Sequence, residues 1–354
     1  MVLPQPAMRT QVSPSLGTKA RRASSSEKIT APPLWLWGPP KSGRCVILTK
    51  CEITRKGLAI TTMSQRTLAN LILLLVTIAW GITFSLTKGA LAIVAVFPYL
   101  AVRFLLAATV MVMMALARPG GRNKLVSFHV LKVGFALGVL LFLSYALQTL
   151  GLQSIEPAIS AFLTGLNVVL VPLLAIPLLG LSASRRTWFA VFTALLGLAL
   201  LDGVAFLSHW SLGSLYTVGC AVFIALQIIY VDKWAPGIDP LALATVEIIT
   251  VALLSLITTL FLHTQAWSPI SSWLHPMVIF AVVLNGLFGT AFAYWAQAHY
   301  QQKTSASYVA LIFTLEPVFA AIIAVLFFGE PLTWSLVLGG FLIISSMLLA
   351  DDSL

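Results

Sequence analysis

Thr304–Trp334 reads TSASYVALIFTLEPVFAAIIAVLFFGEPLTW. The stretch is long and apolar enough to cross a membrane, which takes about 20 residues, yet Glu316 and Pro317 lie near its centre. A charge inside an apolar span costs about 3 kcal/mol or more and is usually functional or paired. A proline removes one backbone hydrogen bond and bends the helix. The stretch therefore predicts a bent helix that lines a polar cavity inside a membrane bundle. A second Glu-Pro pair, Glu330–Pro331, closes it.

The composition of the whole chain also indicates a polytopic membrane protein. Hydrophobic residues make up 59% and charged residues only 9%, whereas soluble domains are roughly a quarter charged. The net charge of +10 is concentrated in residues 1–62, which hold ten of the 21 Lys and Arg residues. A basic segment beside a membrane marks the cytoplasmic side. We therefore expect the lipid bilayer as a partner, and no nucleic acid.

The first 62 residues predict a disordered basic extension, because Ser, Pro, Gly and basic residues mix there without periodicity. Two interpretations stay open. The segment has the composition of an organellar transit peptide, or it is a non-native extension that precedes a true start at Met63. At the other end, 351–354 predicts a short cytoplasmic tail.

From Thr67 onward, apolar runs follow one another with short connections, so the predicted fold is all-α with ten transmembrane helices. They span roughly 68–90, 95–117, 129–152, 156–180, 186–203, 211–232, 240–262, 276–299, 304–328 and 332–350.

The basic residues of the connections predict the orientation, because cytoplasmic loops are enriched in Lys and Arg. With the N-terminus inside, Lys88 is the one basic residue at an outer connection. Both termini are then cytoplasmic, and a bacterial cytoplasmic membrane is the expected location. The cytoplasmic connections hold Arg118, Arg122, Lys124, Arg185, Arg186, Lys233 and Lys303.

An internal repeat divides this body into halves, 63–203 and 204–350, of five helices each. Residues 172–202 parallel residues 318–351, so Gly180 aligns with Gly329 and Asn167 with Glu316. An odd number of helices per half makes the second half insert upside down, which is an inverted repeat. In transporters of this kind the substrate site lies near the midplane, between the halves.

The chain resembles the EamA-like branch of the drug/metabolite transporter superfamily over residues 63–350. The resemblance implies a ten-helix carrier or exporter of small metabolites with a central cavity between its halves. The matching pieces, in order, are WGITFSLTKGAL (80–91), FPYLAVRFLLAA (97–108), YALQTLGLQ (145–153), LNVVLVPLLAIPLLG (166–180) and LEPVFAAIIAVLFFGEPLTW (315–334).

One face of the first helix predicts a substrate pathway. Its aromatic, polar and cationic side chains recur at helical spacing on a single face. The alternative is that Trp80 packs and Lys88 reaches the membrane interface. The face comprises Trp80, Thr83, Phe84, Thr87 and Lys88.

Arg103 and Glu247 are related by the repeat and lie at opposite depths, so we expect no salt bridge between them. Arg103 would contact backbone carbonyls, an anionic group of the substrate or Glu156; the alternative is a structural arginine. Both residues are assigned to the pathway.

Glu316 lies near the membrane midplane, where it could bind a proton or a cationic group of the substrate. The alternative is a structural acid that supports the bend. Helix bends are expected at Pro172 and Pro317. Further pathway candidates, each of which could instead join helices, are Asn167, Tyr145, Gln148, Gln227, Tyr230 and Trp295.

The predicted function is secondary transport of small metabolites (amino acids, amines or drug-like solutes) by alternating access, with a proton as the candidate coupling ion. A flippase for lipid-linked substrates and a membrane-embedded enzyme are the alternatives. The five His residues are scattered, and neither paired acids nor metal-ligand spacing occurs in the sequence. We therefore predict no enzymatic activity, metal or cofactor.

Overall fold

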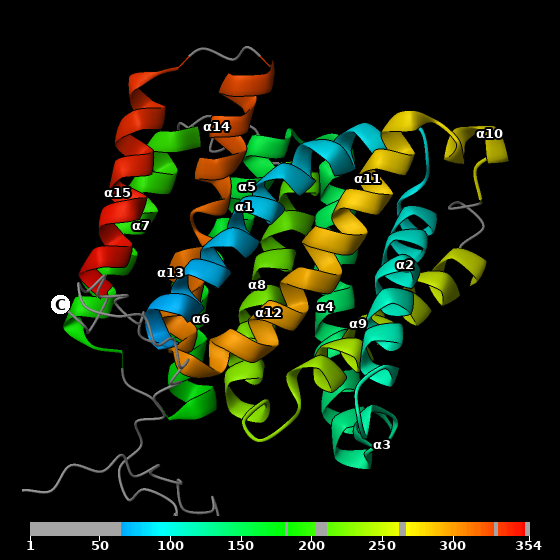
Figure 1. Ribbon diagram of the computed structural model, residues 1–354. Helices are drawn as coiled ribbons and strands as arrows, with labels where there is room; N and C mark the ends of the chain where they lie inside the picture. Colours follow the sequence, from blue (N-terminus) through cyan, green and yellow to red (C-terminus); the bar gives the residue numbers. More distant parts are fainter. Residues whose placement is uncertain (1–64, 181–182, 203–210, 262–266, 329–331, 351–354) are drawn as a thin grey trace, which may run out of the picture. The chain divides into compact units, whose positions relative to one another are not determined.

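The computed structural model describes residues 65–180, 183–202, 211–261, 267–328 and 332–350 (Figure 1). Within these ranges all regular structure is helical, as predicted, and no strand occurs. The N-terminal extension 1–62, the Glu330–Pro331 pair and the tail 351–354 lie outside the described residues, and the expectations about them stay predictions.

Each of the ten predicted apolar segments contains a helix, and seven of them are uninterrupted. Two short helices, α3 (Gly121–Leu125) and α10 (Ile270–Trp273), lie in connections. The uninterrupted helices are α1 (Gln65–Leu91), α2 (Val96–Leu116), α4 (Phe128–Ser154), α7 (Arg185–Asp202), α8 (Leu212–Trp234), α9 (Pro240–Phe261) and α15 (Trp334–Ala350).

Three segments change helical geometry along their length. The fourth consists of α5 (Pro157–Gly165) and α6 (Asn167–Leu179). The ninth consists of α13 (Ala306–Phe313) and α14 (Glu316–Phe328). The eighth consists of α11 (Pro276–Gly286), a π-helical turn η4 (Leu287–Phe292), α12 (Ala293–Tyr300) and a 3₁₀ turn η5 (Gln301–Lys303).

By length and apolar composition, eight helices of the described residues are able to cross a membrane. The other two predicted crossings are α7, which carries Arg185, Arg186 and Asp202 at its ends, and α15, which has 17 residues. By this measure the predicted count of ten crossings is not confirmed, whereas the prediction of a multi-pass membrane protein is.

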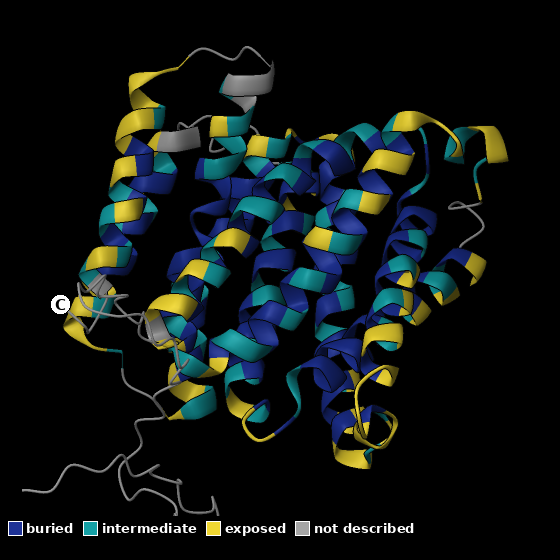
Figure 2. Ribbon diagram, in the orientation of Figure 1, coloured by how far each residue is buried: buried dark blue, intermediate teal, exposed yellow. Residues whose placement is uncertain are grey.

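The helices pair between the two halves of the sequence. α7 packs along α15 (Figure 1), α2 packs along α9, and α4 packs against both α8 and α9. α1 lies against α11, α12 and α14, and α6 lies against α8. Exposed residues recur along α7 and α15 (Figure 2), among them Phe189 and Phe341. Apolar side chains left exposed on helix surfaces are expected where the protein meets lipid.

The connections predicted to be cytoplasmic gather at one end of the bundle. Lys124 Nζ lies 2.8 Å from Asp239 Oδ2, and Lys233 Nζ donates to the Leu178 carbonyl (3.1 Å). Burial alone would raise the pKa of the Asp239 carboxyl, but the hydrogen bonds donated by Lys124 and by the Ala242 N–H hold this pKa below its ordinary value. The shared end agrees with the predicted alternation of the crossings.

Candidate functional site

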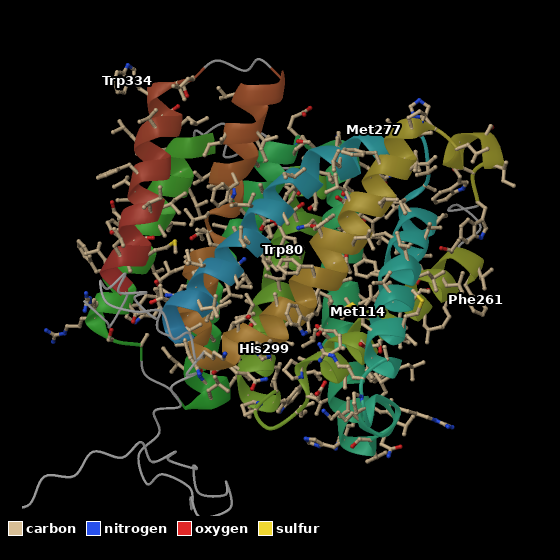
Figure 3. All side chains as sticks on the ribbon, viewed as in Figure 1. Trp80, Met114, Phe261, Met277, His299 and Trp334 are labelled. Carbon is tan, nitrogen blue, oxygen red and sulfur yellow. The ribbon has the colours of Figure 1, made fainter. Side chains whose placement is uncertain are left out.

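A small enclosed cavity lies at mid-height of the bundle, where Figure 3 shows Trp80 between Met277 towards one end and His299 towards the other. The space open to the centre of a water molecule is about 20 Å³, which is room for one water. In this conformation the cavity is closed around anything larger. Its lining comes from six helices and consists of Trp80, Thr83, Tyr145, Gln148, Thr164, Ile224, Tyr294 and Glu316.

Glu316 enters this cavity as the first residue of α14. Ahead of it the Leu315 N–H donates to the Ile312 carbonyl (3.1 Å), a tighter turn than that of an α-helix. Ten residues separate Glu316 from Ala306, or about 15 Å of helix, which is half of a ~30 Å hydrocarbon core. Among the described residues no hydrogen-bond donor reaches the Glu316 carboxylate. The carboxylate is thus free to bind a proton or a cationic group.

Two residues hold the break between α13 and α14 in place. Pro317, the second residue of α14, has no N–H to donate to the Phe313 carbonyl, as its sequence position predicts. Gly81 of α1 lies directly against the break, because a Cβ atom there would be 3.0 Å from the Glu316 carbonyl oxygen and 3.0 Å from the Ala320 nitrogen. Any side chain at this position would push α1 and α14 apart by a few tenths of an ångström or more, so glycine suits the close approach.

Asn167 occupies the equivalent place in the first half. It is the first residue of α6, as Glu316 is of α14, and one residue separates it from the end of α5. Its Nδ2 donates to the Thr164 carbonyl (3.0 Å), while its buried Oδ1 has no partner among the described residues. A helix bend was predicted at Pro172, but Pro172 lies inside α6. The break between α5 and α6 is at Leu166, six residues earlier.

Aromatic rings form one wall of the cavity. The Trp80 indole N–H donates to the Gly289 carbonyl (2.9 Å) in the π-helical turn. The Trp80 ring meets those of Phe313 and Tyr294, at centroid distances of 4.8 and 5.8 Å. Tyr294 OH donates to Tyr145 OH (3.1 Å). A wall of this kind offers π-faces to a cationic ligand.

Arg103 lies behind this wall and is 2% exposed. Its Nε donates to Thr290 Oγ1 (3.1 Å) and its Nη2 to Tyr145 OH (3.4 Å). The guanidinium carbon is 4.9 Å from the centroid of the Tyr145 ring. Among the described residues no ion pair joins Arg103 to Glu247, and hydroxyl groups take the place of the expected carbonyls or Glu156.

The predicted amides and the second acid lie in two separate places. Gln148 is at the cavity, where its Nε2 donates to Thr164 Oγ1 (3.2 Å). Gln227 and Glu247 are both buried, and Gln227 Nε2 donates to Glu247 Oε1 (2.9 Å). Neither lines the cavity around Glu316.

Two stretches of the chain, residues 67–201 and 211–350, match the model of the family described as the EamA-like transporter family. Together they cover most of the sequence and correspond to the two halves predicted from the repeat. The chain belongs to the EamA-like transporter family. The resemblance drawn from the sequence is confirmed, and membrane transport is the activity of the family.

Relatives of this family member include two proteins that are themselves described only as uncharacterized transporters. One, from Archaeoglobus fulgidus, is 28% identical over 287 residues, which cover 81% of this chain and 87% of the relative. The other, YvbV of Bacillus subtilis, is 26% identical over 287 residues, 81% of this chain and 92% of its own. A solved structure, described only as the crystal structure of a protein, superimposes with a TM-score of 0.66 at 19% identity. It covers 81% of this chain and 97% of its own, and it shows the fold alone.

Besides Gln227 and Glu247, four more predicted pathway residues of this EamA-like chain lie away from the cavity. Lys88 Nζ donates to the carbonyls of Leu152 (2.8 Å), Gln153 (3.2 Å) and Ile155 (3.0 Å) at the end of α4. The others are Phe84, which packs in an apolar cluster with Leu152 and Ala161; Tyr230, which stacks on Trp234; and Trp295, which lies against Phe292, His299 and Tyr300.

Several residues that the EamA-like fold brings together were not predicted from the sequence. Thr164, Ile224 and Tyr294 line the cavity, and Thr290 holds Arg103. Tyr294 could have been predicted, because Gln297 and Gln301 follow it at i+3 and i+7 and so form a polar face of the same helical segment. Within the ranges that the structure describes, no three His, Cys, Asp or Glu side chains gather closely enough to hold a metal ion.

Proposed function

We propose that this EamA-like transporter carries a small organic amine, amino acids included, with the ammonium group of the cargo bound at Glu316. The observation that supports this most strongly is a carboxylate without a hydrogen-bond donor beside a wall of aromatic rings. An ammonium group gains an ion pair from the carboxylate and cation–π contacts from Trp80, Tyr145 and Tyr294. A neutral or anionic cargo gains neither.

Transport follows from opening the closed cavity to one side at a time. We assign ten crossings in two inverted halves, with α7 and α15 as the fifth and tenth, the N-terminus in the cytoplasm and a bacterial cytoplasmic membrane as the location. The equivalent breaks before Asn167 and Glu316 support the inverted repeat. So does the packing, because α4 lies on α8 as α12 lies on α1, and α6 lies on α8 as α14 lies on α1. Rocking of the halves about this centre would expose Glu316 alternately.

Proton coupling follows from the use of one carboxylate for two ligands. The Glu316 carboxylate either carries a proton or pairs with the ammonium group, since a neutral carboxyl has no charge to offer the cargo. Release of cargo to one side then goes with uptake of a proton from that side. The predicted cycle is therefore an exchange of amine for proton.

The test is transport by the purified protein in liposomes. Liposomes loaded with a candidate cargo and diluted into labelled cargo of the same class would be compared at pH 6 and pH 8, with amines, zwitterionic amino acids, organic acids and sugars as the panel. We expect counterflow of amines or amino acids that changes between the two pH values. Counterflow of organic acids or sugars alone, or equal rates at both pH values, would contradict the proposal.

A further inference from the structure

Glu247 is a second buried carboxyl group that the proposed cargo site does not use. It is 1% exposed and lies seven residues into α9, so about 10 Å separate it from the end of the bundle where Lys124 and Asp239 meet. Glu316 lies deeper, about 15 Å along its own segment from Ala306, and Tyr294 both lines the cavity of Glu316 and interacts electrostatically with Glu247. The two acids are therefore arranged in series between that end and the centre.

Three amide side chains connect Glu247 to three other elements, and we name this row the amide ladder: Gln227, Gln297 and Gln301. Gln227 Nε2 donates to Glu247 Oε1 (2.9 Å) and Gln297 Nε2 donates to Gln227 Oε1 (3.0 Å). Gln297 Nε2 also donates to Gln301 Oε1 (2.9 Å), and Gln301 Nε2 donates to the Ile228 carbonyl (2.6 Å). Glu247 and the three amides of the ladder are each 2% exposed or less.

The ladder gives Glu247 one neutral donor and no positive charge. Among the residues that the structure describes, no Lys or Arg forms an ion pair with Glu247. The desolvation cost of an ionised carboxylate buried in this way is not offset by an opposite charge and is offset only slightly by one hydrogen bond. A proton removes the charge and with it the cost. The hydrogen bond from Gln227 does not by itself explain why position 247 holds a glutamate, since a glutamine or an aliphatic side chain could be buried there at a lower desolvation cost.

We propose that Glu247 is a second proton-binding site of this transporter, in series with Glu316 and closed from the nearer membrane face by the amide ladder. The buried Oε1 of Gln297, which has no partner among the described residues, adds an acceptor that is unused in the closed ladder. When the ladder opens to water, the Glu247 O–H bond breaks and the proton passes to a water oxygen. The carboxylate left behind keeps the hydrogen bond from Gln227.

The elements packed against α9 bring few charges towards Glu247. Tyr294 of α12 interacts with it electrostatically, and Lys124 of α3 is paired with Asp239. Arg103 of α2 is held by Thr290 and Tyr145. The remaining titratable or charged groups of these elements are Tyr99 of α2, Arg122 of α3, His129 and Lys132 of α4, Tyr216, Cys220, Tyr230, Asp232 and Lys233 of α8, and His299 and Tyr300 of α12.

Infrared difference spectroscopy of the purified protein in lipid vesicles tests the site directly, because a protonated carboxyl group has a C=O stretching band that the carboxylate lacks. We expect a band that appears on acidification, shifts in D₂O, and is lost in Glu247→Gln. The band should remain in the matched control Asp239→Asn, whose carboxyl lies outside the spans, and in Glu316→Gln. The same spectrum from wild type and Glu247→Gln would overturn the proposal.

A second variant covers the case in which Glu247→Gln does not fold. Gln227→Leu removes the donor to the carboxyl oxygen, and the band of Glu247 should move to higher frequency, because hydrogen bonding weakens the C=O bond. An unmoved band would count against Glu247 as its source.

The role of this proton in the cycle rests on the proposed function, whereas the spectroscopic site does not. If liposomes show no amine transport but the band is lost in Glu247→Gln, the proposed function fails and the proton site stands. If amine transport occurs and Glu247→Gln leaves its pH dependence unchanged, the series arrangement is overturned.

Discussion

Lys88 gives a prediction that separates a structural cation from a pathway cation. Its ammonium group binds three carbonyls at the C-terminal end of α4, those of Leu152 and Ile155 in a partly buried setting and that of Gln153 in an exposed one. Lys88→Met keeps an unbranched four-atom stem and removes the ammonium group with all three of its bonds. The carbonyls of α4 then lose both a donor and a favourable charge at the negative end of the helix.

The magnitude follows from these surroundings. A hydrogen bond to a charged group contributes about 1.5–3 kcal/mol in proteins generally, and hydrogen bonds between membrane helices about 0.6 kcal/mol on average. The exposed bond to Gln153 contributes little, so the two partly buried bonds together should contribute about 2 kcal/mol. For a chain of 354 residues that corresponds to a fall in Tm of about 3 °C.

The assay is thermal unfolding of the purified variant in detergent, followed by the cargo panel in liposomes. Lys132→Met is the matched control, since Lys132 is an exposed lysine of α4 that forms no hydrogen bond or ion pair with the described residues, and the Tm of this variant should match that of wild type. We expect Lys88→Met to unfold earlier while keeping the cargo preference of wild type. Wild-type stability together with an altered cargo preference would refute the structural role and restore Lys88 to the pathway.

Three further perturbations probe the cavity and the end of the bundle. Trp80→Leu removes an aromatic wall and the bond to the Gly289 carbonyl, so KM for an amine should rise about tenfold, the equivalent of ~1.4 kcal/mol; an unchanged KM would exclude the cation–π contact. Gly81→Val should abolish transport while membrane insertion persists, because α14 has no room for the added atoms; normal uptake rates would show that the close approach is dispensable. The pKa of the Asp239 carboxyl is lowered in the fold, so this group contributes stability above its unfolded-state pKa, and the contribution is lost as pH falls through the folded-state pKa. Asp239→Asn should therefore reduce the loss of unfolding free energy between pH 6 and pH 3 by about 1 kcal/mol or less, since the pair with Lys124 is partly exposed. The measurement is Tm against pH, and identical curves for wild type and variant would contradict the prediction.

Hydropathy predicted the helices well because a membrane crossing requires a long apolar run, whatever its neighbours are. The predicted segments 211–232 and 240–262 end within two residues of α8 and α9. The π-helical turn η4 was not predictable in this way. Its geometry goes with the hydrogen bonds that Trp80 and Arg103 make to Gly289 and Thr290, two residues distant in sequence from both.

The candidate site was predictable only as far as helix faces could be read. Trp80 and Thr83 could be predicted from their helical spacing and Glu316 from its charge, and all three line the cavity. Trp295 was chosen by residue type, yet its neighbour Tyr294 points inward, since one residue turns a helix by about 100°. Packing against other helices decided between them.

In the proposed cycle Glu316 binds both the ammonium group of the cargo and the exchanged proton. Uptake of labelled amine by liposomes that contain Glu316→Gln, measured at pH 6 and pH 8 beside wild type and Asp239→Asn, tests it most directly. We expect Glu316→Gln to insert and fold but to lose amine uptake at both pH values, while Asp239→Asn retains the pH dependence of wild type. Amine uptake by Glu316→Gln with wild-type rate and pH dependence would contradict it.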